Sequence, residues 1–169
     1  METAFHDIHN DHLVPQYKRQ AVMVQGKDTP SSASHYNAQS SAPDLTDDCY
    51  NQMFYGCTSL TTAPALPATT LTDYCYSSMF SECTSLTTAP VLPATTFAES
   101  CYGSMFKRCS NLNYIKMLAT DVSAGSYLYR WVEGVSSTGT FVKNPALSEE
   151  TIGRGNSGIP VDWTVVNAE

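Results

Sequence analysis

A pattern of cysteines, a Met-Phe pair and a leucine recurs with a 26-residue period between positions 47 and 124, and this period constrains the fold more than any other feature. The copies 47–72 and 73–98 are identical at 18 of their 26 positions, and the copy 99–124 keeps nine identities with the second copy. A unit of this length is too short to bury its own apolar face. The copies must therefore stack on one another, so the sequence predicts a repeat array.

The first half of each copy has the apolar spacing of a helix face. Its apolar residues follow the i, i+3, i+4 and i+7 pattern, and in the first copy Thr46 and Asp47 precede them as a cap and a first-turn acid. We expect one short helix per copy, with its buried face formed by Cys49, Tyr50, Met53, Phe54 and Cys57, by Cys75, Tyr76, Met79, Phe80 and Cys83, and by Cys101, Tyr102, Met105, Phe106 and Cys109.

The second half of each copy follows the L-x-x-L-x-L order of a leucine-rich repeat, which predicts a short strand. The inward positions would be Leu60, Ala63 and Ala65, then Leu86, Ala89 and Val91, then Leu112, Ile115 and Met117. Pro64 and Pro90 cannot donate to a ladder, so we expect imperfect pairing until Lys116 replaces them in the third copy. The expected fold is an α/β solenoid: a short right-handed leucine-rich-repeat array with one short helix and one short parallel strand per 26-residue coil.

The two ends of the chain differ from the repeats between them. Residues 1–40 are expected to form an N-terminal extension or cap of unclear structure, residues 41–126 the leucine-rich repeats, and residues 127–169 a degenerate repeat with a C-terminal cap. Shifting the pattern by one more period places Trp131 on the helix face and Phe141 at the strand position of Ile115. Trp163 and Val165 are expected to add a last strand over this fourth copy.

The repeat motif C-Y-x-x-M-F-x-x-C-T-S-L-T-T-A-P-x-L-P-A-T-T resembles the 26-residue repeat of BspA-like leucine-rich-repeat surface proteins and lipoproteins of bacteria. The segments that begin at Asn111, Trp131 and Gly158 resemble those that close such arrays. The resemblance implies a non-enzymatic, cell-surface or secreted module that binds host or microbial surface proteins or glycans. We expect no export signal within residues 1–40, which contain no apolar signal core. This leaves a structural or host-recognition component of a phage virion as the alternative.

Charge and hydropathy exclude several classes of partner. The net charge is −7, and no Lys or Arg occurs between Asp28 and Phe106. Nucleic-acid phosphates would therefore meet a neutral or acidic surface, and we expect no nucleic-acid binding. No run of about 20 apolar residues is present, so we expect no membrane span. The chain is expected to be a monomer.

The residues that could support chemistry have simpler interpretations. Six cysteines favour buried free thiols over bridges, because Cys49 and Cys57 would lie about 12 Å apart on one helix; one or two bridges remain the alternative. His6, His9 and His12 have a spacing that could bind a metal, but a polar terminus explains them equally well. We expect no metal and no cofactor.

Catalytic motifs are not supported by their context. His35 is the remaining histidine for a catalytic dyad, and no nucleophile motif accompanies it. The segment 153–158 matches G-x-G-x-x-G, but it does not join a strand to a helix within a dinucleotide-binding unit, so it is interpreted as a glycine-rich turn. We expect no enzymatic activity.

The outward side of the strand ladder is the predicted ligand-binding surface, because repeat arrays use their extended strand face for partners. Its candidate residues are Thr62, Thr88, Tyr114, Lys116 and Thr140. Threonine on an exposed strand is also ordinary strand chemistry. Tyr114 and Lys116 interrupt the uniform threonine pattern, so they are the strongest candidates.

Overall fold

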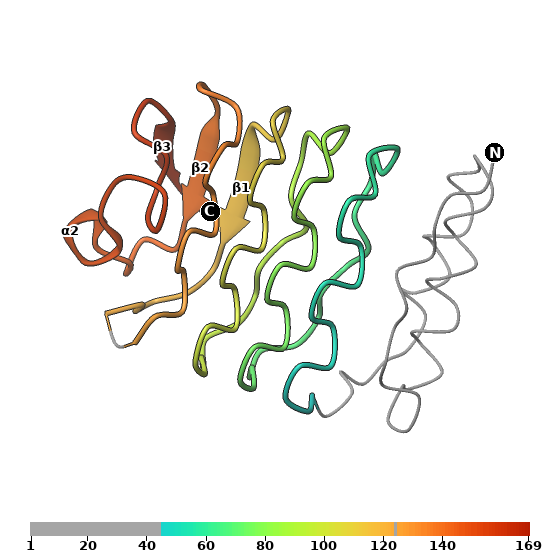
Figure 1. Cartoon of the computed structure of the whole chain (residues 1–169). Helices are drawn as coiled ribbons and strands as arrows, with labels where there is room; N and C mark the ends of the chain where they lie inside the picture. Colours follow the sequence, from blue (N-terminus) through green and yellow to red (C-terminus); the bar gives the residue numbers. More distant parts are fainter. Residues whose placement is uncertain (1–44, 124) are drawn as a thin grey trace, which may run out of the picture.

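The computed structural model describes residues 45–123 and 125–169, in which four similar units lie side by side (Figure 1). The units begin at residues 47, 73, 99 and 125, and are called units 1 to 4 below. Bridges join positions one period apart, such as Thr70 to Thr96 and Thr88 to Tyr114, so the repeat of the sequence is also a repeat in space. The arrangement is compatible with a solenoid.

A small parallel sheet occupies the C-terminal part of the array. It contains β1 (Tyr114–Met117), β2 (Thr140–Lys143) and β3 (Thr164–Asn167) in the order β1-β2-β3. Ile115 pairs with Phe141, and Phe141 pairs with Val165. These pairs agree with the expected strand position of Phe141 and with a last strand through Val165, whereas Trp163 lies just before that strand. Units 1 and 2 contribute isolated bridges in place of strands, as expected from their prolines.

The helices expected at the start of each unit do not form. Residues 47–56, 73–82 and 99–108 are chains of tight turns, and the helix within the described residues is the four-residue α2 (Glu149–Ile152). Every fourth residue of these turns has a positive φ, for example Ser78 at 53° and Ser104 at 53°. The helix prediction was therefore wrong for all three copies.

Backbone hydrogen bonds explain why turns replace helices. In unit 2 the amides of Tyr76 and Phe80 donate to Cys101 and Met105 of the next unit, at 3.0 Å each. The intervening amides donate three residues back, as Met79 does to Tyr76 at 3.2 Å. A helix would use every amide within its own segment, and a helix of about eight residues is marginal in water. The turn chain instead uses alternate amides to join neighbouring units.

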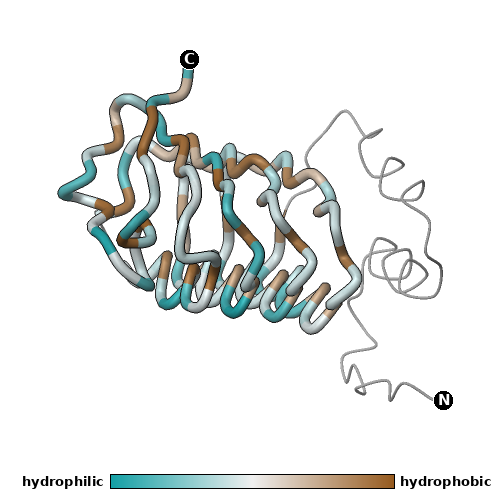
Figure 2. The backbone as a smooth tube through the Cα atoms, turned by 90° about the horizontal axis from the view of Figure 1, so that it is seen from above, coloured by the Kyte–Doolittle hydropathy of each residue, from teal (hydrophilic) through white to brown (hydrophobic). Residues whose placement is uncertain are grey.

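Side chains of the same type lie over one another between the turns and the strands. The rings of Phe54, Phe80 and Phe106 stack with centroids 5.5 and 5.8 Å apart, and Tyr50, Tyr76 and Tyr102 form a similar column. Met79 and Met105 are buried, whereas Met53 in unit 1 is half-buried. Hydrophobic (brown) segments recur along the array (Figure 2). Their alignment agrees with the predicted columns.

Two of the expected inward strand positions are exposed. Val91 is 47% exposed and Ala65 is also exposed, while Leu92 and Leu66 are buried in their place. Thr88 bridges Tyr114 but Leu92 bridges Met117, so unit 2 uses one more residue than unit 3 over this stretch. This is the pattern of a bulge, and Pro90, which has no amide hydrogen to pair, lies within it.

Candidate functional site

The outward strand face brings three of the five predicted ligand residues into one row. Thr88 bridges Tyr114, Tyr114 pairs with Thr140, and Thr140 pairs with Thr164. Since residues directly opposite on a sheet point to the same side, their side chains form a continuous row of hydroxyl groups. Thr164 was missed by the sequence reasoning because it follows Thr140 by less than one full 26-residue period. We call these four residues the hydroxyl row.

A second row of paired residues lies beside it. Lys116 pairs with Val142, and Val142 pairs with Val166; Val142 is buried, whereas Val166 is 41% exposed. Ile115 and Phe141, between the two rows in sequence, are fully buried on the other side of the sheet. The face therefore combines hydroxyl groups, one ammonium group and an exposed valine.

Thr62 is not joined to this face by backbone pairing. It is exposed, and among the described residues no hydrogen bond involves the segment 61–68. The prolines of this segment, Pro64 and Pro67, lack the amide hydrogen that a ladder needs. The predicted ligand face is therefore continuous from Thr88 onward, and Thr62 lies beyond a gap.

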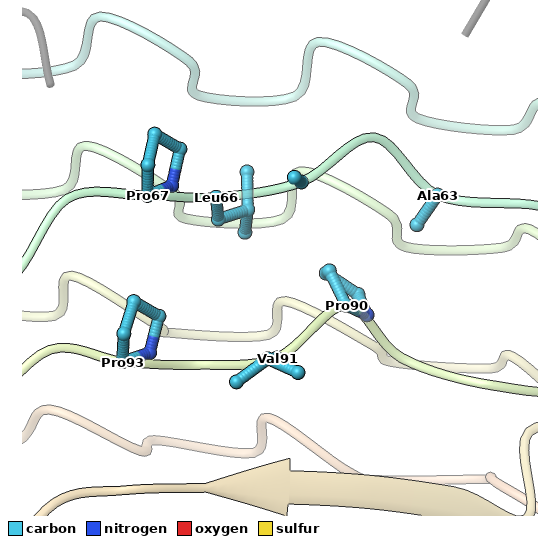
Figure 3. Close-up of a pocket in the computed structure, with 7 residues that line it drawn as sticks. Ala63, Leu66, Pro67, Pro90, Val91 and Pro93 are labelled. Carbon is cyan, nitrogen blue, oxygen red and sulfur yellow. The ribbon is translucent and has the colours of Figure 1, made fainter. Parts of the chain in front are cut away.

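That gap is a groove of about 380 Å³ between units 1 and 2 (Figure 3). We call it the proline groove; it is lined by Ala63, Ala65, Leu66, Pro67, Pro90, Val91 and Pro93. Pro67 and Pro93 project in the same direction from neighbouring segments (Figure 3). The walls are rings and aliphatic groups, and no side chain among the lining residues carries a charge or a hydrogen-bonding group. Sequence reasoning did not find this groove, although the repeated P-x-L-P tetrapeptide was its signal.

Polar pairs between units lie on the turn segments instead. The Tyr74 hydroxyl donates to Glu99 Oε1 at 2.8 Å, and this hydrogen bond raises the pKa of Tyr74. A hydrogen bond to Glu82 likewise raises the pKa of Tyr55, and Arg108 pairs with Glu82 at 3.0 Å. Glu82 is half-buried and the other groups are exposed, so solvent screens these pairs and they add little stability.

Cys75, Cys83, Cys101 and Cys109 are free thiols in the structure, and five of the six cysteines are buried. Cys83 and Cys109 donate from Sγ to the carbonyl oxygens of Phe54 and Phe80, at 3.1 and 2.9 Å. Burial raises the pKa of Cys75 to about 12 and that of Cys101 to about 11. A reactive cysteine has a lowered pKa and is accessible, so these thiols lack the character of nucleophiles.

The glycine-rich motif and the histidines are the remaining candidates for chemistry. Residues 153–158 follow α2, and Arg154 bridges Ile159 just beyond them, which confirms the glycine-rich turn. Trp131 Nε1 donates to Gly158 O at 2.8 Å, so the turn closes the C-terminal end of the array. Within residues 45–123 and 125–169 no group of three or more acidic, Cys or His side chains could hold a metal ion. His6, His9, His12 and His35 lie outside the described residues.

Comparisons with protein-family models, curated proteins and solved structures found no match to this chain. In the part of the chain that the structure describes, no helix has the length and apolar character that crossing a membrane requires.

Proposed function

We propose that this protein is a short leucine-rich-repeat solenoid of the BspA-like type, and that it acts as a non-enzymatic binding module at the cell surface. Its ligands are host or microbial proteins or glycans, held on the outward strand face. The single observation that carries this proposal is the continuous hydroxyl row of Thr88, Tyr114, Thr140 and Thr164. Extended rows on an array are suited to long, repetitive partners, because each unit offers one more contact.

The chemistry of the face favours recognition over catalysis. Tyrosine offers a large contact area with little conformational entropy to lose, and it is enriched where binding energy is concentrated. Lys116 lies in the neighbouring row and adds a positive charge to a chain of net charge −7. The buried thiols, with their raised pKa values, argue against a cysteine nucleophile.

Binding to a combined protein and glycan array would test the proposal, with wild type compared with Tyr114→Ala. We expect Tyr114→Ala to weaken binding by about tenfold, the effect of losing about 1.4 kcal/mol at an interface. The matched control is Tyr129→Ala, because Tyr129 is 57% exposed but lies on the turns of unit 4. Binding that is equally reduced in both variants, or unchanged in Tyr114→Ala, would contradict the assignment of the strand face.

A further inference from the structure

The proline groove is open because neither of its walls pairs across it. On one side, the segment 61–68 makes no hydrogen bond to any part of the chain that the structure describes. On the other side, the amides of Ala89 and Leu92 donate to Tyr114 and Lys116 of unit 3, at 2.9 Å each, away from the groove. Two neighbouring extended segments thus lie beside each other, with main-chain groups at the rim that do not pair across the groove and apolar rings on the walls.

The lining selects against several kinds of ligand. An anion would find no cation, since the chain has no Lys or Arg between Asp28 and Phe106. Units 1 and 2 carry carboxylates alone among ionised side chains: Asp47, Asp48, Asp73 and Glu82, all on the turn segments, where Glu82 pairs with Arg108 of unit 3. A sugar would place hydroxyl groups against proline and aliphatic walls that offer no polar side chain, and burying unpaired hydroxyl groups is costly. The volume of about 380 Å³ is near the lower limit of ligand pockets, about 300 Å³, and is too small for a large cofactor.

A flat apolar group with one hydrogen-bond donor fits these conditions. The ring of Tyr or Trp can pack against the faces of Pro67, Pro90 and Pro93, while its O–H or N–H reaches a main-chain carbonyl at the rim. The net negative charge of units 1 and 2 favours a neutral or basic partner segment over an acidic one. We propose that the proline groove receives an aromatic side chain, tyrosine or tryptophan, from a neutral or basic segment of a partner protein. The inference rests on the proposed binding function and favours a protein over a glycan as its ligand.

Nuclear magnetic resonance of the ¹⁵N-labelled full chain would test the proposal with p-cresol and indole as probes. We expect both to shift the amides of Ala63, Ala65, Leu66 and Val91 in a saturable manner, with Kd values on the order of 10 mM for fragments of this size. Cyclohexanol, which has the hydroxyl but no aromatic ring, should shift them less at equal concentration, and N-acetylglucosamine should not shift them. Shifts with N-acetylglucosamine alone would overturn the aromatic assignment in favour of a glycan, and no saturable shift with either aromatic probe would overturn the site.

A variant and its control locate the site. Val91→Arg places a long charged side chain at the rim and should weaken binding of both aromatic probes by at least about threefold, a loss of only about 0.7 kcal/mol. The matched control is Val161→Arg, because Val161 is 68% exposed but lines no part of the proline groove. Ala65→Leu, which fills the groove without adding charge, serves in place of Val91→Arg if that variant loses its native amide spectrum. Equal binding by wild type and the groove variant would refute the proposal.

The two proposals fail separately. If Tyr114→Ala weakens binding to the protein and glycan array but the aromatic probes do not bind, the groove proposal is refuted and the strand-face proposal stands. If the probes bind in the groove but no ligand is found on the protein and glycan array, the strand-face proposal is refuted and the groove proposal stands.

Discussion

The chain of turns predicts that glycine stabilises the protein at a position where, in a helix, it would destabilise it. Ser104 has a φ of 53°, a region that costs an L-residue roughly 1–2 kcal/mol, whereas glycine adopts it freely. Glycine loses roughly 0.5–1 kcal/mol through its greater freedom in the unfolded chain. The net gain expected for Ser104→Gly is therefore about 0–1.5 kcal/mol, with a central value of about 0.7 kcal/mol. In a helix the same change would instead destabilise the protein by several tenths of a kcal/mol.

The matched control is Ser110→Gly in the same unit. Ser110 is exposed and is not among the residues with positive φ, so glycine there should cost about 0.5–1 kcal/mol. For a protein of this size about 1 kcal/mol corresponds to about 2–4 °C in Tm. Differential scanning calorimetry should therefore show Ser104→Gly above wild type and Ser110→Gly below it.

Ser78 occupies the corresponding position of unit 2, also with a φ of 53°, so Ser78→Gly should likewise raise Tm. Ser104→Val should lower Tm, because a β-branched residue is strongly disfavoured at positive φ. A Tm for Ser104→Gly that falls as far as that of Ser110→Gly would refute the turn geometry and restore the helix.

The remaining predictions concern a close contact and the buried thiols. Gly139→Ala should lower the free energy of unfolding by about 1–3 kcal/mol in urea titrations, because its Cβ would clash with a main-chain carbonyl of unit 3 and approach Trp163 Cε2 to 2.7 Å. Gly103→Ala should lower it less, because the nearest atom to its Cβ would be 3.1 Å away. Equal losses in the two variants would contradict this steric explanation. Burial raises the pKa of Cys75 to about 12 and of Cys101 to about 11 from an ordinary 9.0, so their contribution to stability is complete below about pH 9 and is lost as pH rises toward 12. Thermal unfolding at about pH 8 and pH 10.5 should show this loss, and an equally steep fall in Cys75→Ala would assign it to other groups.

The sequence predicted the stacking of the units because the repeat itself encodes it. Phe54, Phe80 and Phe106 had to lie over one another once the chain made one circuit per repeat, and the pairing of Ile115 with Phe141 followed from the same period. The interruption of the ladder by prolines was also predictable, because a missing amide hydrogen is a local property.

The helices could not be excluded from the apolar spacing. Apolar residues four positions apart lie on one side of both a helix and a chain of four-residue turns, so the spacing does not distinguish them. Gly56 and Gly134, at φ of 71° and 76°, were the available signal for turns, but Gln52 and Arg130 occupy the same kind of position. The distinction depends on amide donors that reach the next unit, and that is a tertiary property.

The candidate site was predicted in part for similar reasons. Thr88, Tyr114 and Thr140 obey the period and were found, whereas Thr164 departs from it and was not. Val91 was expected to point inward, because a pattern of alternation cannot anticipate an extra residue beside Pro90. The proline groove was also missed, because the absence of pairing between two neighbouring segments is a tertiary property.

The amides of the turn segments that join neighbouring units do so through main-chain atoms, whatever side chain each residue carries. A duplicated copy of one unit would meet the same main-chain donors and acceptors on the units on either side of it. A gene encoding such a chain can therefore gain or lose whole units by unequal recombination while the fold persists, and the number of surface contacts can change without the invention of any new interaction.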